Sequence, residues 1–246
     1  VPTGSVAQAA GTASYTCLAT RAADGETGRF AGTVNTVLRN ALAVAVPICA
    51  WMAAIAEPLI RFLFEQGRFT RSDTETCAFL LVLMLPGVLF WVVHQIVSRS
   101  FYAYEDTLTP TIIGTATTVI FLPIYWLFTR VFGAPGVAVA GVLGIGAYTV
   151  VMAVVWQKRR GKASFSGLGV FTAKAIAAAT LPGVFAWATG VKAATLMPEA
   201  PVFGAAAAFT LGSLVFAALY LPLAWKAVPG LLDPFFPIVR KIFRRK

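Results

Sequence analysis

Charged residues are scarce in this sequence: they make up 12% of its 246 residues, about half of the fraction usual in soluble chains. Hydrophobic residues make up 58%, and the mean hydropathy is +0.78. This composition excludes an ordinary soluble globule. About six apolar runs approach the roughly 20 residues that a membrane-spanning helix needs, and they lack the alternation of a membrane barrel. The sequence therefore predicts an all-α, polytopic transmembrane helix bundle.

Acidic residues are half as frequent as basic ones, 10 against 20, which gives a net charge of +10. A nucleic-acid-binding protein would gather such an excess on one basic face with interleaved aromatic residues. Here the basic residues fall instead in connectors and at the C-terminus. We therefore expect no nucleic-acid partner, and we interpret the basic connectors as cytoplasmic loops that follow the positive-inside rule.

Residues that hold metals or perform catalysis are few. Cys17, Cys49 and Cys77 are too far apart for a metal motif, and their odd number suits no disulfide framework. His94 is the single histidine, with no Cys, Asp or second His at the spacing of a ligand set or a catalytic triad. A phosphate-binding glycine loop is also absent. The sequence predicts no catalytic residue, no metal site and no cofactor, and so a transporter or a scaffold rather than an enzyme.

The apolar pattern divides the chain into one membrane domain, 1–246. Six full spans are expected over 35–56, 72–103, 110–132, 137–157, 168–189 and 202–225. A partial helix is expected over 1–20, a short interfacial helix over 57–66 that Gly67 ends, and an amphipathic helix over 231–246. Ser72 to Glu75 is expected to cap the second span, and Thr109 to cap the third with Pro110 in its first position.

The distribution of lysine and arginine predicts the orientation. The connector 158–162 and the C-terminal tail carry the densest basic clusters, so both should be cytoplasmic. Counting spans backwards places 133–136 outside, 104–109 inside, 57–72 outside and 21–34 inside. The basic tail should also bind anionic lipid headgroups. Five tryptophans are expected to form belts at the two interfaces. They are Trp51, Trp126 and Trp187 outside, and Trp156 and Trp225 inside.

Polar side chains inside spans are candidate substrate-binding residues, because placing a polar group in hydrocarbon costs free energy that a function would have to justify. His94, Gln95 and Arg99 lie together near the inner end of the second span. They form either a polar wall of a water-filled cavity, where Arg99 meets a phosphate, or a set in which Arg99 extends to the headgroups and His94 bonds a neighbouring helix. Lys174 allows the same two interpretations. Arg39 is expected to open its helix and to meet lipid phosphate.

Prolines lie in five of the six expected spans: Pro47, Pro86, Pro123, Pro182 and Pro222. Transporters use broken helices to line sites and to flex, which makes Pro47, Pro86 and Pro182 hinge candidates. Proline is also commoner in membrane helices in general, and that alternative stays open.

Two polar connectors carry a resemblance to a known family. One reads Phe64-Glu65-Gln66-Gly67-Arg68-Phe69-Thr70, and the other begins with Arg99-Ser100-Phe101-Tyr102-Ala103 and continues through Asp106 and Thr107 to Thr109-Pro110. Together they resemble the C-terminal half of the MurJ/MviN family of lipid II flippases, whose pattern there is approximately "LFERGRFT", a long helix, and "R-x-FYA-x-x-DT-x-TP". In the first helix, Val1-Pro2-Thr3-Gly4 and Gly11-Thr12-Ala13 resemble the family helix that precedes these connectors.

The resemblance implies the C-terminal lobe of a two-lobed, alternating-access flippase of the multidrug/oligosaccharidyl-lipid/polysaccharide exporter superfamily. The implied substrate is lipid II, a diphosphate-linked saccharide-peptide on a polyprenyl chain, and the implied location is the bacterial cytoplasmic membrane. The last two helices, 168–189 and 202–225, would form a groove for the polyprenyl tail. The chain begins as though cut from something longer. The N-terminal lobe would precede Val1, and so would the Asp-Arg pair at the start of the family helix that 1–20 resembles.

Two other functions remain open from the sequence. One is an exporter of the same superfamily that carries drugs or another lipid-linked sugar, which would differ in the motif at 99–110. The other is a membrane scaffold that retains the fold without transport, which the polar first helix, with Gln8 and Arg21, favours.

Overall fold

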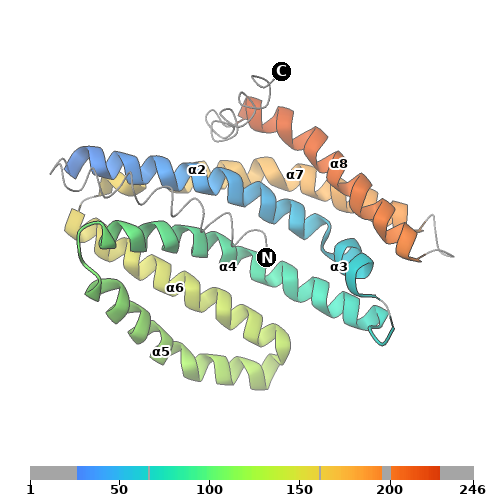
Figure 1. The fold of residues 1–246 in the computed structure, drawn as a ribbon, viewed down its shortest axis with the longest axis horizontal. Coiled ribbons are helices and arrows are strands. Elements are labelled where there is room, and N and C mark those ends of the chain that lie inside the picture. The colour runs from blue at the N-terminus through green and yellow to red at the C-terminus, as the bar shows by residue number, and fades with distance from the viewer. Residues whose placement is uncertain (1–26, 66, 161, 196–200, 228–246) are drawn as a thin grey trace. The chain divides into compact units, whose positions relative to one another are not determined.

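The computed structural model describes residues 27–65, 67–160, 162–195 and 201–227, and in these ranges the chain is all-α (Figure 1). Six described helices are long and apolar enough to cross a membrane, which confirms the predicted fold class. The expected helix over 1–20 and the expected tail helix over 231–246 lie outside the described residues. The helices are α2 (Thr27–Ala54), α3 (Ala56–Phe64), α4 (Arg71–Tyr102), α5 (Leu108–Phe132), α6 (Ala134–Arg160), α7 (Leu168–Thr195) and α8 (Pro201–Ala227), with a short 3₁₀ helix, η1 (Lys162–Phe165), before α7.

The contacts divide the chain into two compact units. Unit 1 comprises Val1–Ala45 and Pro86–Thr172, and unit 2 comprises Val46–Leu85 and Ala173–Lys246. The boundaries fall inside α2, α4 and α7, and two of them adjoin Pro47 and Pro86. Helix geometry nevertheless continues through all five span prolines, so the expected interruptions are not seen as breaks. Neighbouring groups in a membrane helix can satisfy the carbonyl that a proline leaves free.

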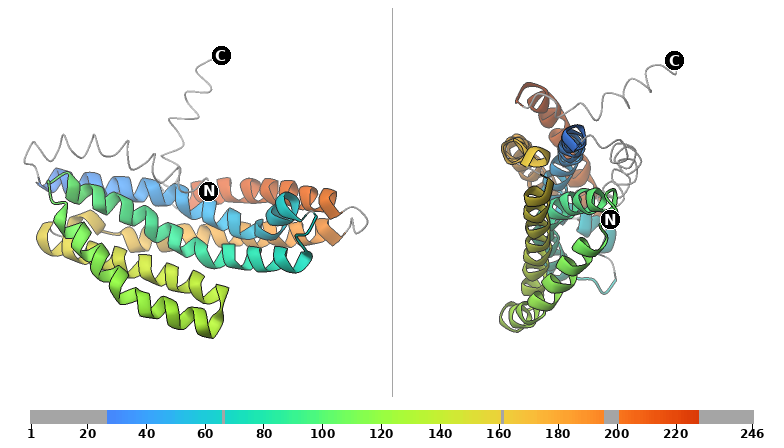
Figure 2. Two further views of the ribbon diagram at one scale, coloured as in Figure 1. Left: turned by 60° about the horizontal axis from the view of Figure 1, so that its bottom comes forward. Right: turned by 90° about the vertical axis from the view of Figure 1, so that its left-hand side faces the viewer.

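In unit 1, α5 and α6 form a helical hairpin (Figures 1 and 2). Gly133, with φ of +63°, makes the turn, and its N–H bonds the carbonyl of Thr129 at 3.0 Å. A side chain at Gly136 would collide with the carbonyl of Phe128, and one at Gly144 would meet the ring of Phe121 at 3.4 Å. Small residues therefore let the two helices approach, as the four-residue spacing on this face predicts. Helix α6 begins three residues earlier than expected.

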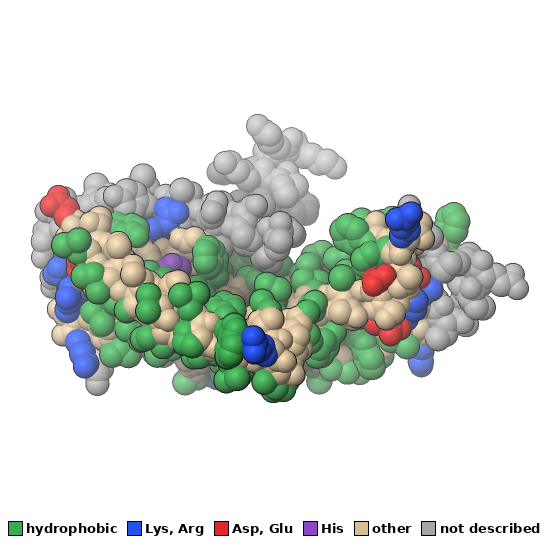
Figure 3. Space-filling view, turned by 90° about the horizontal axis from the view of Figure 1, so that it is seen from below, with side chains coloured by type: hydrophobic (Ala, Val, Ile, Leu, Met, Phe, Trp, Pro, Cys, Tyr) green, Lys and Arg blue, Asp and Glu red, His purple; other side chains and the backbone are tan. Residues whose placement is uncertain are grey.

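The outer surface of the α5–α6 hairpin is apolar and exposed. The side chains of Ile112, Ile120 and Leu127 on α5 are all more than half exposed, and none of the apolar window of α5 is buried. Hydrophobic side chains cover most of the described surface seen in Figure 3, with the charged ones confined to a few places. Such a surface needs hydrocarbon around it.

In unit 2, the short helix α3 packs against α8. Ala56 and Ile60 of α3 and Ala78 of α4 form a small buried core, and Phe69, Cys77 and Leu81 pack against it. Trp51 donates its indole N–H to Ser213 Oγ on α8 at 3.0 Å and is half-buried. The indole N–H of Trp51 thus has its partner inside the unit, and the placement of Trp51 near the outer membrane interface stays a prediction. Trp126 on α5 and Trp187 on α7 are exposed, and their interfacial position stays a prediction.

The helix starts differ from the predicted caps. Helix α4 begins one residue before Ser72, and its capping box joins Thr70 to Asp73: the carboxylate accepts from the Thr70 N–H at 2.8 Å. Helix α5 begins at Leu108, and Asp106 accepts the backbone N–H of Thr109 at 3.0 Å. Thr109 is thus a donor within the first turn rather than the cap, because the carboxylate of Asp106, two residues before Leu108, already accepts its N–H.

Helix α4 ends in a Schellman motif at the start of the α4–α5 connector. Asp106 N–H bonds the carbonyl of Phe101 at 3.1 Å, and Glu105 N–H bonds that of Tyr102 at 3.0 Å. Glu105 has φ of +60° and is the only described residue other than glycine with a positive φ. Glycine usually takes this position, since a Cβ there crowds the backbone. The connector therefore holds a locally strained glutamate beside the cap of α5.

Substitution at Glu105 tests this geometry. Glu105→Val should lower the free energy of unfolding in detergent by about 1–2 kcal/mol, because a β-branched residue strongly disfavours positive φ. Glu105→Gly should leave it within about 0.5 kcal/mol of the parent chain, since relief of strain offsets the added freedom of the unfolded chain. Thr107→Val is the matched control, because Thr107 has an ordinary φ of −88°. An undiminished unfolding midpoint for Glu105→Val would show that the connector does not hold this conformation.

Candidate functional site

Asp106 is the centre of a polar network in unit 1. Its carboxylate accepts the Thr109 hydroxyl at 2.7 Å and the Arg159 guanidinium at 2.8 Å, in addition to the Thr109 N–H. Arg159 Nη1 also donates to Thr109 Oγ1 at 2.9 Å. Arg159 belongs to the last turn of α6, which continues through three of the residues expected in the basic connector 158–162. The network therefore ties the end of α6 to the start of α5.

The electrostatics of Asp106 favour its charged form. Desolvation raises the pKa of this carboxyl, but the hydrogen bonds from the Thr109 N–H and hydroxyl, together with the charge and hydrogen bond of Arg159, lower the pKa by more. The net pKa lies below its ordinary value. Asp106 therefore remains a carboxylate at neutral pH.

Trp156 stands beside this network and is 1% exposed. Its ring meets Phe101 edge-on at 5.0 Å between centroids, and Phe30 meets Tyr104 at 4.9 Å. Its indole N–H donates to Ser164 Oγ of η1 at 3.1 Å. Trp156 is therefore buried rather than exposed as a belt residue would be, because the ring fills the space between α2, α4 and η1 and its polar N–H is satisfied there; its level near the inner membrane interface stays a prediction.

Asn35 and Arg39 lie one turn apart on α2 and hold the segment that follows η1. Asn35 Nδ2 donates to the carbonyls of Ser164 at 3.1 Å and Ser166 at 3.0 Å, and Arg39 Nη2 donates to Ser166 at 3.0 Å. A side chain at Gly167 would meet Arg39 Nη2 at 2.7 Å. The prediction that Arg39 opens its helix is wrong, since α2 begins at Thr27. Arg39 instead donates to the carbonyl of Ser166, just after the short 3₁₀ turn.

His94, Gln95 and Arg99 lie on α4 within unit 1. His94 Nδ1 is 3.5 Å from Ser98 Oγ, and its ring is 4.4 Å from the ring of Tyr148 on α6. Gln95 and Arg99 are half-buried, and within the described ranges their side chains form no hydrogen bond or ion pair. The hydrogen-bond contact of His94 is thus with its own helix, and its contact with the neighbouring helix α6 is between rings. The assignment of all three as substrate-binding residues stays a prediction.

The other predicted site residues lie elsewhere in the chain. Lys174 is on α7, is exposed, and belongs to unit 2, whereas His94 and Arg99 belong to unit 1. Pro47 and Pro182 are buried and Pro86 is exposed. Their role as hinges stays a prediction.

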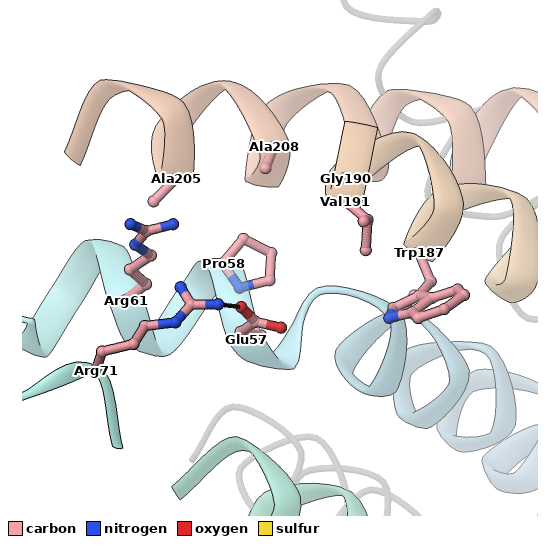
Figure 4. A pocket seen from close by; sticks show the side chains of 10 residues that line it. Glu57, Pro58, Arg61, Arg71, Trp187, Gly190, Val191, Ala205 and Ala208 are labelled. Carbon is pink, nitrogen blue, oxygen red and sulfur yellow. Dashed lines mark hydrogen bonds and ion pairs between the residues drawn. The ribbon is translucent and has the colours of Figure 1, made fainter. Parts of the chain in front are cut away.

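Unit 2 contains a pocket of about 240 Å³ next to α3 (Figure 4). Arg71 forms an ion pair with Glu57 at one end, and Trp187, 55% exposed, lies towards the other. Ala205 and Ala208 of α8 form one wall, where small residues leave room. Both arginines of this pocket are paired: Arg61 Nε lies 3.2 Å from Glu65 Oε1. The pocket carries no uncompensated positive charge for an anionic ligand.

Glu65 and Arg71 also stabilise the connector between α3 and α4. Glu65 accepts the hydroxyl of Thr74, a fully buried residue, at 2.8 Å. Arg71 also contacts Glu75 at 3.0 Å. Gly67 has φ of +64° and lies in the turn after α3, as predicted, although α3 ends at Phe64, two residues early. The polar motif here therefore stabilises a helix–helix junction.

Sequence reasoning missed the residues that organise unit 1: Asn35, Asp106, Trp156 and Arg159. The signal for the first was present, because Asn35 and Arg39 are polar residues four apart in an apolar span. Asp106 precedes Thr109 by three residues, which is the spacing of a capping residue and its N–H donor. No local pattern links Asp106 to Arg159, which is 53 residues away. In the described ranges, no group of three or more His, Cys, Asp or Glu is placed to hold a metal ion.

These features define a class of protein: a polytopic α-helical membrane protein with apolar outer helix faces and polar networks at the helix connections. Comparison with known proteins gives the family. The family model "Lipid II flippase MurJ" matches residues 2–206. The chain therefore belongs to the MurJ family of lipid II flippases, which are transporters rather than enzymes.

Individual relatives agree with this assignment. The chain is 29% identical over 116 residues to the lipid II flippase MurJ of Thermosipho africanus, which covers 46% of this chain and 24% of that protein. It is 27% identical over 139 residues to a probable lipid II flippase MurJ of Vibrio cholerae, covering 56% and 26%. The matched regions thus span about a quarter of each of these curated relatives.

A solved structure has the same fold. It is a lipid II flippase MurJ in an inward closed conformation, with a TM-score of 0.61 and 20% sequence identity. The likeness covers 91% of this chain and 44% of that one. At this identity, the comparison establishes the fold alone.

The charge on Asp106 gives a testable pH dependence. Because the folded pKa lies below the unfolded one, the carboxylate stabilises the fold above its unfolded pKa, and this contribution is lost as the pH falls through the folded pKa. Asp106→Ala should lower the free energy of unfolding by about 1–2 kcal/mol at neutral pH. The difference from the parent chain should shrink between about pH 5 and about pH 2. The measurement is denaturant unfolding in detergent at both pH values.

Asp106→Asn is the matched control, since an amide oxygen still accepts the Thr109 N–H but loses the charge that attracts Arg159. Its free energy of unfolding at neutral pH should lie between those of the parent chain and Asp106→Ala. The difference between Asp106→Asn and Asp106→Ala should depend little on pH. A constant gap between Asp106→Ala and the parent at all pH values would contradict the charge-based account.

Proposed function

We propose that this chain is the C-terminal lobe, a single membrane domain, of a lipid II flippase in the bacterial cytoplasmic membrane. In this proposal the whole protein moves the lipid-linked peptidoglycan precursor from the inner to the outer leaflet by alternating access. The observation that carries it is the family match over residues 2–206. The fold likeness covers 44% of the solved flippase, which supports the proposal that this chain acts together with another lobe.

The proposed orientation has the C-terminus and the 158–162 connector in the cytoplasm. Lys158, Arg159 and Arg160 form the last turn of α6, and five further basic residues lie in the tail 231–246. Such clusters are retained on the cytoplasmic side during insertion. The tail is also proposed to bind anionic headgroups there, at about 1 kcal/mol for each basic residue near the surface.

The proposed substrate contact is the diphosphate of lipid II with Arg99. A half-buried guanidinium that lacks a described partner, on a helix with His94 and Gln95, suits the bidentate recognition of phosphate oxygens. The segments 168–189 and 202–225, within α7 and α8, are the proposed groove for the polyprenyl tail. Pro47, Pro86 and Pro182 are the proposed hinges of the alternating motion.

Complementation tests this function. Residues 1–246 alone should not sustain growth of bacteria depleted of their lipid II flippase, because the other lobe of the cavity is required. Fused behind a family N-terminal lobe with the start of the first helix, the same residues should restore growth. Growth supported by the bare chain, at confirmed membrane expression, would show that the transport machinery lies within one lobe.

Within the fusion, Arg99→Ala should reduce lipid II translocation at least about tenfold, since a charge-assisted hydrogen bond to phosphate contributes about 1.5–3 kcal/mol. Arg130→Ala is the matched control: it also removes one cation from a membrane helix, but from an exposed position in the last turn of α5 outside the proposed site, and should retain translocation. Arg99→Lys should recover only part of the activity, because an ammonium cannot form the bidentate contact. Full activity of Arg99→Ala would assign Arg99 to the headgroup region instead.

A further inference from the structure

We propose that unit 1 contains a binding site for one phosphate group at the C-terminal end of α6, supplied by an anionic phospholipid headgroup or by free phosphate. The site is two adjoining cavities of about 190 and 240 Å³, which we call the connector pocket. Both cavities are lined by Tyr104, Trp156, Arg159 and Arg160. This inference requires only that α6 ends at a membrane surface, so it does not depend on the proposed transport.

The connector pocket carries one positive charge that no described carboxylate neutralises. Asp106, which lines one of the cavities, neutralises Arg159 at 2.8 Å. Arg160 has no carboxylate partner within the described ranges, and its guanidinium lies 3.8 Å from the centroid of the Tyr104 ring. A ring held against one face of a guanidinium leaves its N–H edge free to bind oxygen atoms. The pocket therefore suits a singly charged phosphate.

The polar and apolar parts of the pocket match a phospholipid headgroup. Ser164 lines one cavity and offers a hydroxyl, although that oxygen already accepts the Trp156 indole N–H. Phe30 and Phe101 border the two cavities beside Trp156 and give an apolar base. Each cavity is several times the roughly 30 Å³ that a water molecule occupies in the liquid, which is enough for a phosphate group. Basic pockets between membrane helices at the cytoplasmic side bind anionic headgroups in general.

The pocket near α3 provides an internal contrast. It has a similar volume and also contains two arginines, but both of these are paired with glutamates. The difference between the two places is the single unpaired Arg160, which makes this residue the one to change.

The test uses the full chain in lipid nanodiscs of phosphatidylcholine with increasing phosphatidylglycerol, and native mass spectrometry counts the lipids retained. Arg160→Gln should weaken phosphatidylglycerol retention about fivefold. Lys158→Gln is the matched control, because Lys158 is a basic residue of the same helix turn that does not line either cavity. It should change retention by less than about twofold. The basic tail is the same in both variants, so its binding cancels.

A second arm distinguishes the source of the phosphate. Inorganic phosphate is added to chain in pure phosphatidylcholine discs, and the thermal midpoint is followed. A rise in the thermal midpoint of the parent chain that is absent in Arg160→Gln supports free phosphate as the ligand. If the midpoint does not rise, but Arg160→Gln weakens phosphatidylglycerol retention, the ligand is the lipid headgroup. Tyr104→Leu, which removes the ring beside Arg160, should weaken retention in the same direction. Equal losses in Arg160→Gln and Lys158→Gln would reveal diffuse surface attraction and overturn the proposal.

Discussion

Hydrocarbon offers no hydrogen bonds, and this constraint explains where the charges of the chain are found. The described ion pairs lie at helix ends and connectors: Asp106 with Arg159 in unit 1, and Glu57, Glu65 and Glu75 with two arginines in unit 2. Between them, hydroxyls inside helices return to their own backbone, as Thr117 does to the carbonyl of Ile113 at 2.8 Å. The apolar spans can therefore face lipid only because the connectors satisfy their own polar groups.

The connector between α4 and α5 shows how much structure a short polar segment can determine. Within a few residues, Glu105 ends α4 at positive φ, Asp106 caps α5, and the same carboxylate holds the last turn of α6 through Arg159. The part of this segment that resembles the flippase pattern thus has a structural explanation that is independent of substrate. The need to hold these three helix ends in place is sufficient to explain its polar residues.

The sequence alone predicts the fold class, because six long apolar runs are incompatible with a soluble fold and with a membrane barrel. It also predicts the α5–α6 hairpin from Gly133, and the family from the two connectors. It does not predict that Trp156 is buried, that Arg39 binds Ser166, or that Asp106 pairs with Arg159. These choices depend on partners 8 to 127 residues away, and hydropathy cannot distinguish an indole that faces lipid from one that fills a core. Cap positions also fail by one to three residues, because several hydroxyls and carboxylates compete for the same helix start.

If hydrocarbon sorts the charges in this way, the connectors must alternate between the two sides of the membrane, with the most basic one inside. The most direct measurement is the labelling of single cysteines at Gly67 and Lys162 by a membrane-impermeant maleimide, with Cys17, Cys49 and Cys77 replaced by alanine. We expect the Gly67 position to be labelled in intact cells, and the Lys162 position only after the membrane is opened. Labelling of both positions from the same side would contradict the assignment of the spans between them.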